Sequence, residues 1–453
     1  MTYSKIIFTT LSYLMLAGFL PLLFGLVKPV IAYSLVWILL SVLYLIYSFQ
    51  LKGIQIEGRD IYKFLALSIV VRLLFLFTEP IGSDDVYRYM WDGKAQDAGV
   101  NPYLYKPVDK ELNYLHSEIL PSKMNFQEMK TIYFPLSQWL FYIGYKISGE
   151  SVWAYKFLLL ISEIFTLLLL YKILAKLKIA KKYLLLYALA PLPIIQFAFD
   201  AHLDGFGLPL LLAFIYFYLD DKKILSAIFL GLSFSIKPVG VLILPILFLR
   251  EKRITYKVLM VTVPFISFGV QFLPYIFTSN PFEAFLIYTR NWFYNGLIFN
   301  LLNSIIHNNQ TARLWCSILL VISLVPVYFS KKDFLDKTYF AVLLLLIFSP
   351  VVHPWYIAWL LVLSVIAQKM SGIYFAAAAA LTSLTVWNYQ INGVWKDYLH
   401  VQIIEYVPVI ILFVYEFIKP KKFNMPVCRK LAEIIKFNFL CFEKKEPRNT
   451  EAP

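Results

Sequence analysis

Apolar runs of membrane-spanning length recur along this chain, from about residue 6 to about residue 418. A run of about 20 mostly apolar residues can cross the hydrocarbon layer of a membrane as an α-helix. With 60% hydrophobic and only 15% charged residues, the 453-residue chain is too apolar for a soluble globular domain. The runs are also too long for the strands of a membrane barrel. The sequence therefore predicts an all-α fold, a polytopic bundle of transmembrane helices.

Clusters of lysine and arginine between the runs predict how the chain is oriented, because short basic connections tend to stay in the cytosol. This rule predicts about 12–14 spans, with both termini in the cytosol. It also predicts one transmembrane catalytic domain over residues 1–418 and a basic cytosolic tail over residues 419–453. The first run, residues 6–27, is expected to be a retained helix, because it lacks the small-residue cleavage pattern of a secretory signal.

A long connection over residues 79–150 is predicted to be an outer catalytic loop that contains interfacial, amphipathic helices. Within it, residues 132–147 are apolar enough to suggest a further crossing. A crossing there would place the lysine cluster of residues 176–182 outside, although this cluster contains no acid. We therefore expect residues 132–147 to lie on the membrane surface or to dip into it.

The outer loop begins with an acidic and aromatic stretch, SDDVYRYMWDGKAQDAGVNPY, over residues 83–103. Ser83 is expected to cap a helix, with Asp84 and Asp85 in its first turn, where the helix dipole favours ionised carboxylates. The aromatic residues that follow are expected to anchor this helix at headgroup level: Tyr87, Tyr89 and Trp91. Two adjacent carboxylates suit a general base or a cation ligand. The alternative is an interfacial helix whose acids only cap and solvate it.

The lysine rule places further ionisable residues on the same outer face as the acidic pair. Lys237 and His353 each directly precede a proline that opens an apolar run, and proline is favoured at the first helical position. Both side chains are therefore expected at helix N-termini, which bind phosphate through free backbone N–H groups. The alternative is a snorkelling lysine and an interfacial histidine. The other outer-face residues are Asp200, His202, Asp204 and Arg290.

The stretch at residues 83–103, with SPVVHPWY far downstream at residues 349–356, resembles the GT-C class of integral-membrane glycosyltransferases. The similarity points to the polyprenyl-phosphate-mannose-dependent branch related to the GPI mannosyltransferases. It covers about residues 60–370, and SIKPVGVLILP and WFYNGLIFNLL occupy corresponding positions. The resemblance implies transfer of a hexose, with mannose as the family expectation, from a polyprenyl-phosphate donor to an acceptor hydroxyl, with inversion.

In that family an acidic pair in the first large outer loop carries the catalytic base. The resemblance therefore assigns Asp84 as the base, with Asp85 assisting it or holding a divalent metal ion such as Mg or Mn. The adjacent acids differ from the spaced DxD of some relatives, which leaves metal dependence open. We assign the donor phosphate to Lys237, His353, Arg88 and Arg290. Candidates for binding the acceptor or the sugar are Asp92, His202, Asp204, Asn295, Trp355 and Tyr356.

A transporter or flippase of lipid-linked sugars is the alternative from another class of protein. Against it, the ionisable residues gather at one interface instead of lining a path through the middle of the membrane. The predicted partners are a polyprenyl-phosphate sugar donor, a glycan, lipid or protein acceptor, and membrane lipids. Nucleic acid is not expected, because the basic residues are concentrated in short connections and in the tail. The predicted location is a bacterial inner membrane.

Overall fold

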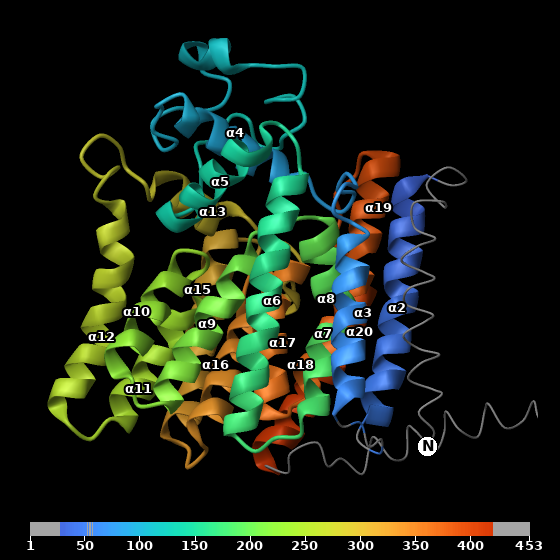
Figure 1. Cartoon of the computed structure of the whole chain (residues 1–453), viewed down its shortest axis with the longest axis vertical. Helices are drawn as coiled ribbons and strands as arrows, with labels where there is room; N and C mark the ends of the chain where they lie inside the picture. Colours follow the sequence, from blue (N-terminus) through green and yellow to red (C-terminus); the bar gives the residue numbers. More distant parts are fainter. Residues whose placement is uncertain (1–27, 52, 54–55, 57, 420–453) are drawn as a thin grey trace, which may run out of the picture.

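The computed structural model describes residues 28–51, 53, 56 and 58–419 of the chain. Within these residues every regular element is helical (Figure 1). Extended pairing is limited there to isolated bridges that join Tyr294 and Asn295 to Val351. The predicted all-α fold is therefore confirmed.

Most helices follow one another with short connections, whereas α4 and α5 are joined by a long one, and several helices are interrupted by a tighter or wider turn. The bounds are α2 (Pro29–Leu51), α3 (Arg59–Leu73), α4 (Asp85–Asp97), η1 (Lys110–Leu115), α5 (Pro135–Ser148), α6 (Trp153–Lys176), η2 (Lys181–Leu184), α7 (Leu185–Ala188), α8 (Pro191–Pro193), η3 (Ile194–Phe199), α9 (Asp204–Leu219) and α10 (Lys223–Phe234). The second half contains η4 (Pro238–Ile243), α11 (Leu244–Arg250), α12 (Ile254–Gly269), η5 (Val270–Phe272), α13 (Glu283–Asn291), α14 (Leu297–Ile306), α15 (Asn309–Phe329), α16 (Phe334–Phe348), α17 (Pro354–Ala367), α18 (Met370–Ala378), η6 (Ala379–Thr382), α19 (Ser383–Asn392) and α20 (Leu399–Ile418).

Six of the described helices are long and apolar enough to cross a membrane, which makes this a multi-pass membrane protein. A seventh span is formed if the pair Lys181–Ala188 and Pro191–Phe199, bent by 43°, is taken together. Five further apolar helices are shorter. The predicted count of about 12–14 spans includes four of these shorter helices, all except Leu297–Ile306, and the run at residues 6–27. That first run, and the basic tail from residue 420, lie outside the described residues.

The helices form a bundle with a cap at one end, built by α4, α5, α13 and the connections around them (Figure 1). α5 lies beside α4 in this cap. That residues 132–147 do not cross the membrane stays a prediction. The expected headgroup anchoring of α4 by Tyr87, Tyr89 and Trp91 is wrong, because all three are buried inside the protein. Tyr89, for example, stacks on Phe141 of α5 with ring centroids 4.4 Å apart.

Helix α17 lies in the core of the bundle, and most of its side chains are buried on all sides. A helix that is apolar all round is stable only when other helices surround it. Its N-terminus begins with Pro354, and His353 is the residue before it. The core helix therefore presents its N-terminal end, with His353, to the region where the bundle meets the cap.

The cap and the lysine-rich connection between α6 and α7 lie at opposite ends of the bundle (Figure 1). We predict that a tag near Lys123, in the cap, and a tag after Lys182, in that connection, are reachable from opposite sides of the membrane. Cysteine labelling with a membrane-impermeant reagent, in intact and in opened cells, measures this. Labelling of both positions from the same side would contradict the topology and would mean that α5 crosses.

Candidate active site

A cavity of about 750 Å³ opens where the cap meets the ends of the bundle helices. Its walls come from segments far apart in the sequence: α2, the start of α4, residues 125–134, α13, the N-terminal end of α17, and α19. Aromatic side chains and a few polar groups share the lining. The volume and the mixed lining are typical of a site for a small organic ligand.

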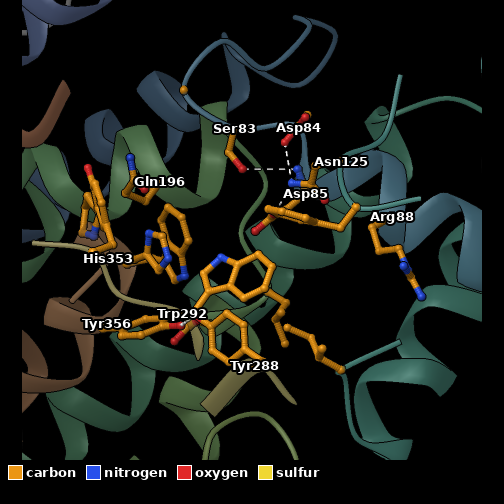
Figure 2. Close-up of a pocket in the computed structure, with 18 of the residues that line it drawn as sticks. Ser83, Asp84, Asp85, Arg88, Asn125, Gln196, Tyr288, Trp292, His353 and Tyr356 are labelled. Carbon is orange, nitrogen blue, oxygen red and sulfur yellow. Dashed lines mark hydrogen bonds between the residues drawn. The ribbon is translucent and has the colours of Figure 1, made fainter. Parts of the chain in front are cut away.

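The predicted acidic pair lies on the wall of this cavity. Helix α4 begins at Asp85 with Asp84 as its cap residue, so the predicted cap, Ser83, lies one position earlier. Ser83 Oγ accepts a hydrogen bond from the Asp85 backbone N–H at 3.2 Å. The amide nitrogen of Asn125 donates to both carboxylates, at 2.6 Å to Asp84 Oδ1 and 2.9 Å to Asp85 Oδ1 (Figure 2). One amide therefore holds both acids in place.

The two carboxylates have different electrostatic surroundings. Asp84 is exposed to the cavity, but the surrounding walls and the charge of Asp85 raise its pKa to about 6. Burial also disfavours the charge on Asp85, but His202 and Asn125 outweigh this effect and lower the pKa of Asp85. Near neutral pH both acids are ionised, and Asp84 is the stronger base. Such a separation of pKa values assigns different roles to two neighbouring acids.

His202 lies behind Asp85 and does not line the cavity. Its side chain is 1% exposed, and its Nδ1 lies 3.5 Å from Asp85 Oδ2. This contact is too long for a good hydrogen bond, and neither ring nitrogen of His202 has another partner among the described residues. His202 was predicted to bind the sugar or the acceptor. The structure places it where it acts on Asp85 instead.

Four rings from three segments form a continuous stack beside the acidic pair. His202 lies on Trp355 with ring centroids 3.5 Å apart, Trp355 on His353 at 4.3 Å, and His353 on Tyr294 at 4.7 Å. Trp355, His353 and Tyr294 line the cavity. Because protein atoms surround His353, its pKa falls to about 3, so its ring is neutral at ordinary pH. The predicted phosphate ligand His353 is thus an uncharged, stacked ring at the start of α17.

Lys237 lies at the start of η4, as the following proline predicted. Its Nζ donates to Asp204 Oδ1 at 2.7 Å, and lies 2.9 Å from the ring centre of Tyr356. Asp204 Oδ1 also accepts from Trp359 Nε1 at 2.7 Å. Lys237, Asp204 and Tyr356 all line the cavity. Asp204, predicted to bind sugar, therefore mainly holds the lysine.

Besides His202, three predicted site residues do not line the cavity. Asp92, on α4, is buried, and it accepts from Arg88 Nε at 2.9 Å and from Thr131 Oγ1 at 2.6 Å. Asn295 is buried and donates to Glu405. Arg290 is exposed on α13. Arg88 itself reaches the cavity wall, but its guanidinium is directed away from the acidic pair, toward Asp92 and the backbone of Met129 (Figure 2).

Several other residues of this site have no sequence signal that singles them out. Asn125 comes from an irregular part of the cap, and no local pattern indicates that it reaches the acidic pair. Tyr288 and Trp292, which stack on each other at 5.5 Å, also line the cavity. Their aromatic character alone does not separate them from the many aromatic residues of the spans.

The metal prediction was made for Asp85. Among the residues that the structure describes, no group of three or more His, Cys, Asp and Glu side chains could hold a metal ion. Asp85 is engaged instead by Asn125 and His202. Metal dependence therefore stays a prediction, and no step below is assigned to a metal ion.

Residues 15–251 match the family model of the α-(1→6)-mannopyranosyltransferase N-terminal domain, the MptA/B family. This match covers more than half of the 453 residues. The chain belongs to this family. The predicted resemblance to mannosyltransferases is confirmed, and so is the predicted enzyme class, a glycosyltransferase. The match favours the transferase over the transporter that was the alternative.

Two solved structures of one protein are similar to this chain. The crystal structure of ArnT from Cupriavidus metallidurans bound to undecaprenyl phosphate shares 14% identity, covers 78% of this chain and 75% of that chain, and gives a TM-score of 0.44. The apo structure of the same protein also shares 14% identity, covers 78% and 76%, and gives a TM-score of 0.43. No curated protein matches the chain.

The raised pKa of Asp84 can be tested without an activity assay. We expect infrared difference spectra to show one carboxylate that gains its proton as the pH falls through about 6, and we expect this band to be absent in Asp84→Asn. Asp85→Asn removes the neighbouring negative charge, so the pH midpoint of this protonation should shift toward 3.8, the ordinary pKa of an aspartate. An unchanged midpoint in Asp85→Asn would show that the two carboxylates do not interact.

Proposed function

We propose that this protein transfers a mannosyl residue from a polyprenyl-phosphate donor to an acceptor hydroxyl, with Asp84 as general base. The observation that carries the proposal is the acidic pair on the cavity wall, in a chain whose family is described by α-(1→6)-mannosyl transfer. Asp84 is open to the cavity and has a raised pKa, both of which suit a base. Asp85, held by Asn125 and His202, is the supporting acid.

The proposed reaction is a single displacement at the anomeric carbon. Asp84 takes the proton of the acceptor hydroxyl while the acceptor oxygen forms a bond to that carbon. The bond between the anomeric carbon and the donor phosphate oxygen breaks, and polyprenyl phosphate leaves with the electron pair. Attack from the side opposite the leaving group inverts the configuration. The ring stack and the aromatic walls keep water away from the sugar, which limits hydrolysis.

The donor phosphate is proposed to bind between Lys237 and the N-terminal end of α17. Both line the same cavity as the acidic pair. The free backbone N–H groups of a helix start and a lysine charge stabilise an anion, and the departing phosphate gains negative charge. His353, as a neutral ring at this helix start, would donate a hydrogen bond rather than a charge. Arg290, exposed on α13, has no place in this proposal.

We further infer that the cap lies on the outer side of a bacterial inner membrane, with both termini in the cytosol. The lysine-rich connections at the opposite end of the bundle support this orientation. A polyprenyl-phosphate donor would then extend its apolar chain between the lipid-facing helices. A metal ion, if the enzyme needs one, would bind near Asp85.

Asp84→Asn tests the base. Asparagine caps a helix nearly as well as aspartate, so the fold should persist, whereas loss of a general base should lower the rate about 10²–10⁴-fold. The measurement is transfer of radiolabelled mannose by purified protein. Asp97→Asn is the matched control, because Asp97 is the last residue of the same helix and forms a partly exposed ion pair with Lys146. Near-normal transfer by Asp84→Asn would remove Asp84 from the mechanism.

Lys237→Gln tests the phosphate site, since glutamine can still donate to Asp204. Loss of one charged hydrogen bond costs about 1.5–3 kcal/mol, or about ten- to hundred-fold in rate. The control is Lys130→Gln, because Lys130 lines the same cavity but forms a more exposed pair with Glu283 at 3.0 Å.

The double variant Lys237→Gln/His353→Ala tests whether both residues bind the same phosphate. In that case the loss of rate in the double variant should differ from the sum of the two single losses, expressed as free energies, because residues that share a ligand are coupled. Strictly additive losses would mean two separate sites. Unchanged rates in both single variants would remove both residues from donor binding.

A further inference from the structure

A buried carboxylate outside the cavity holds the backbone that carries the acidic pair. Asp200 is 0% exposed and lies in the connection that follows η3. Its Oδ1 accepts from the backbone N–H groups of Ile81 at 3.1 Å and Gly82 at 2.8 Å. These two residues come directly before the segment of Ser83, Asp84 and Asp85. The acidic pair is therefore two residues from a fixed point.

The second oxygen of Asp200 is fixed by the bundle. Its Oδ2 accepts from the Tyr33 hydroxyl, on α2, at 2.6 Å. Gln196 Nε2, from η3, lies 3.4 Å from the same oxygen. The carboxylate thus joins two bundle segments to the loop that enters the cap. Hydrogen bonds to an ionised acceptor are among the stronger ones in proteins.

The chain around Asp200 is bent in a way that directs its side chain toward this loop. The Asp200 backbone N–H donates to Ile195 O at 2.9 Å, a bond that spans five residues and widens the helix. Ala201, the next residue, has a φ of 61°, which is uncommon for a residue other than glycine. Wide turns and such conformations cluster at functional sites.

The loop fits closely against this clamp. A Cβ atom added at Gly82 would collide with the Tyr33 hydroxyl and with the Asp200 carboxylate, so only glycine allows this approach. At the other end of this connection, just after α3, Lys156 Nζ from α6 donates to the backbone oxygen of Phe75 at 3.0 Å. The connection between α3 and α4 is therefore held by the bundle at both of its ends.

We propose that Asp200 is a positioning residue for the reaction: its carboxylate fixes residues 81–82 and thereby sets where Asp84 and Asp85 face the cavity. Its effect on catalysis rests on the function proposed above, whereas its effect on the loop does not. A displacement of about 1 Å at reacting groups can cost about 10²-fold in rate. The carboxylate acts through hydrogen-bond geometry and touches no substrate.

Two substitutions at Asp200 separate geometry from charge. Asp200→Ala removes all acceptors, so we expect kcat to fall about 100-fold with little change in the KM for the donor. In Asp200→Asn, Oδ1 can still accept from both N–H groups and the new amide can donate to the Tyr33 hydroxyl. This variant should therefore keep most of the wild-type kcat. A loss in Asp200→Asn as large as that in Asp200→Ala would overturn the positioning role, because charge would then be what matters.

The matched control is Glu416, which has the same kind of clamp elsewhere in the bundle. Its Oε1 accepts from the backbone N–H groups of Met370 at 2.6 Å and Ser371 at 3.2 Å. Glu416→Ala should lower thermal stability as Asp200→Ala does, but leave kcat unchanged. If Asp200→Ala does not fold, Gly82→Ala displaces the loop from the other side and should reproduce the loss of kcat.

Hydrogen–deuterium exchange of the full-length protein in detergent or lipid tests directly whether Asp200 holds the loop. Asp200→Ala should speed exchange in residues 80–86, Asp200→Asn should not, and Glu416→Ala should speed exchange near residues 370–371 instead. Wild-type exchange of residues 80–86 in Asp200→Ala would overturn the clamp. A wild-type protein without transferase activity would contradict the proposed function, while the exchange data would still decide the clamp.

Discussion

A charge inside an apolar helical bundle needs a partner, because burial of an unpaired ion costs far more than folding can easily offset. Lys237 and Asp204 meet this constraint at the cavity wall, and Arg72 and Glu163 meet it between α3 and α6 at 2.8 Å. Asp84 differs from these groups. It is open to the cavity and shares one amide donor, Asn125, with Asp85, so its carboxylate keeps free acceptor capacity for a hydroxyl of a substrate.

The rest of the site depends on how that pair is kept charged and in place. His202 lies against Asp85 from behind, and the ring stack through Trp355 and His353 fixes His202 in turn. The same stack passes the start of α17, the core helix that contributes to the proposed phosphate site. The acids and that site are thus connected through one set of rings, while Asn125 holds the acids from the cap and Asp200 holds the loop before them.

Local rules in the sequence predicted the parts of this site that depend on local structure. Proline after Lys237 and after His353 predicted two helix starts, and both helices begin there. The lysine rule also predicted that residues 132–147 lie on the membrane surface or dip into it without crossing, and this stays a prediction. Local rules could not predict which side chains from distant segments contact each other. The contact between Asp204 and Lys237, and that between Asn125 and the acidic pair, depend on tertiary packing. Arg290 was assigned to the donor phosphate only because the lysine rule placed it on the outer side of the membrane. In the structure it is exposed on α13.

We propose that this enzyme transfers mannose from a lipid phosphate and not from a soluble donor. The most direct measurement uses purified protein in lipid vesicles, supplied with radiolabelled mannose either as polyprenyl-phosphate mannose or as a sugar nucleotide. We expect labelled acceptor only with the lipid donor, together with inversion at the anomeric carbon. Transfer from the sugar nucleotide, or movement of intact lipid-linked sugar across the vesicle membrane without transfer, would contradict it.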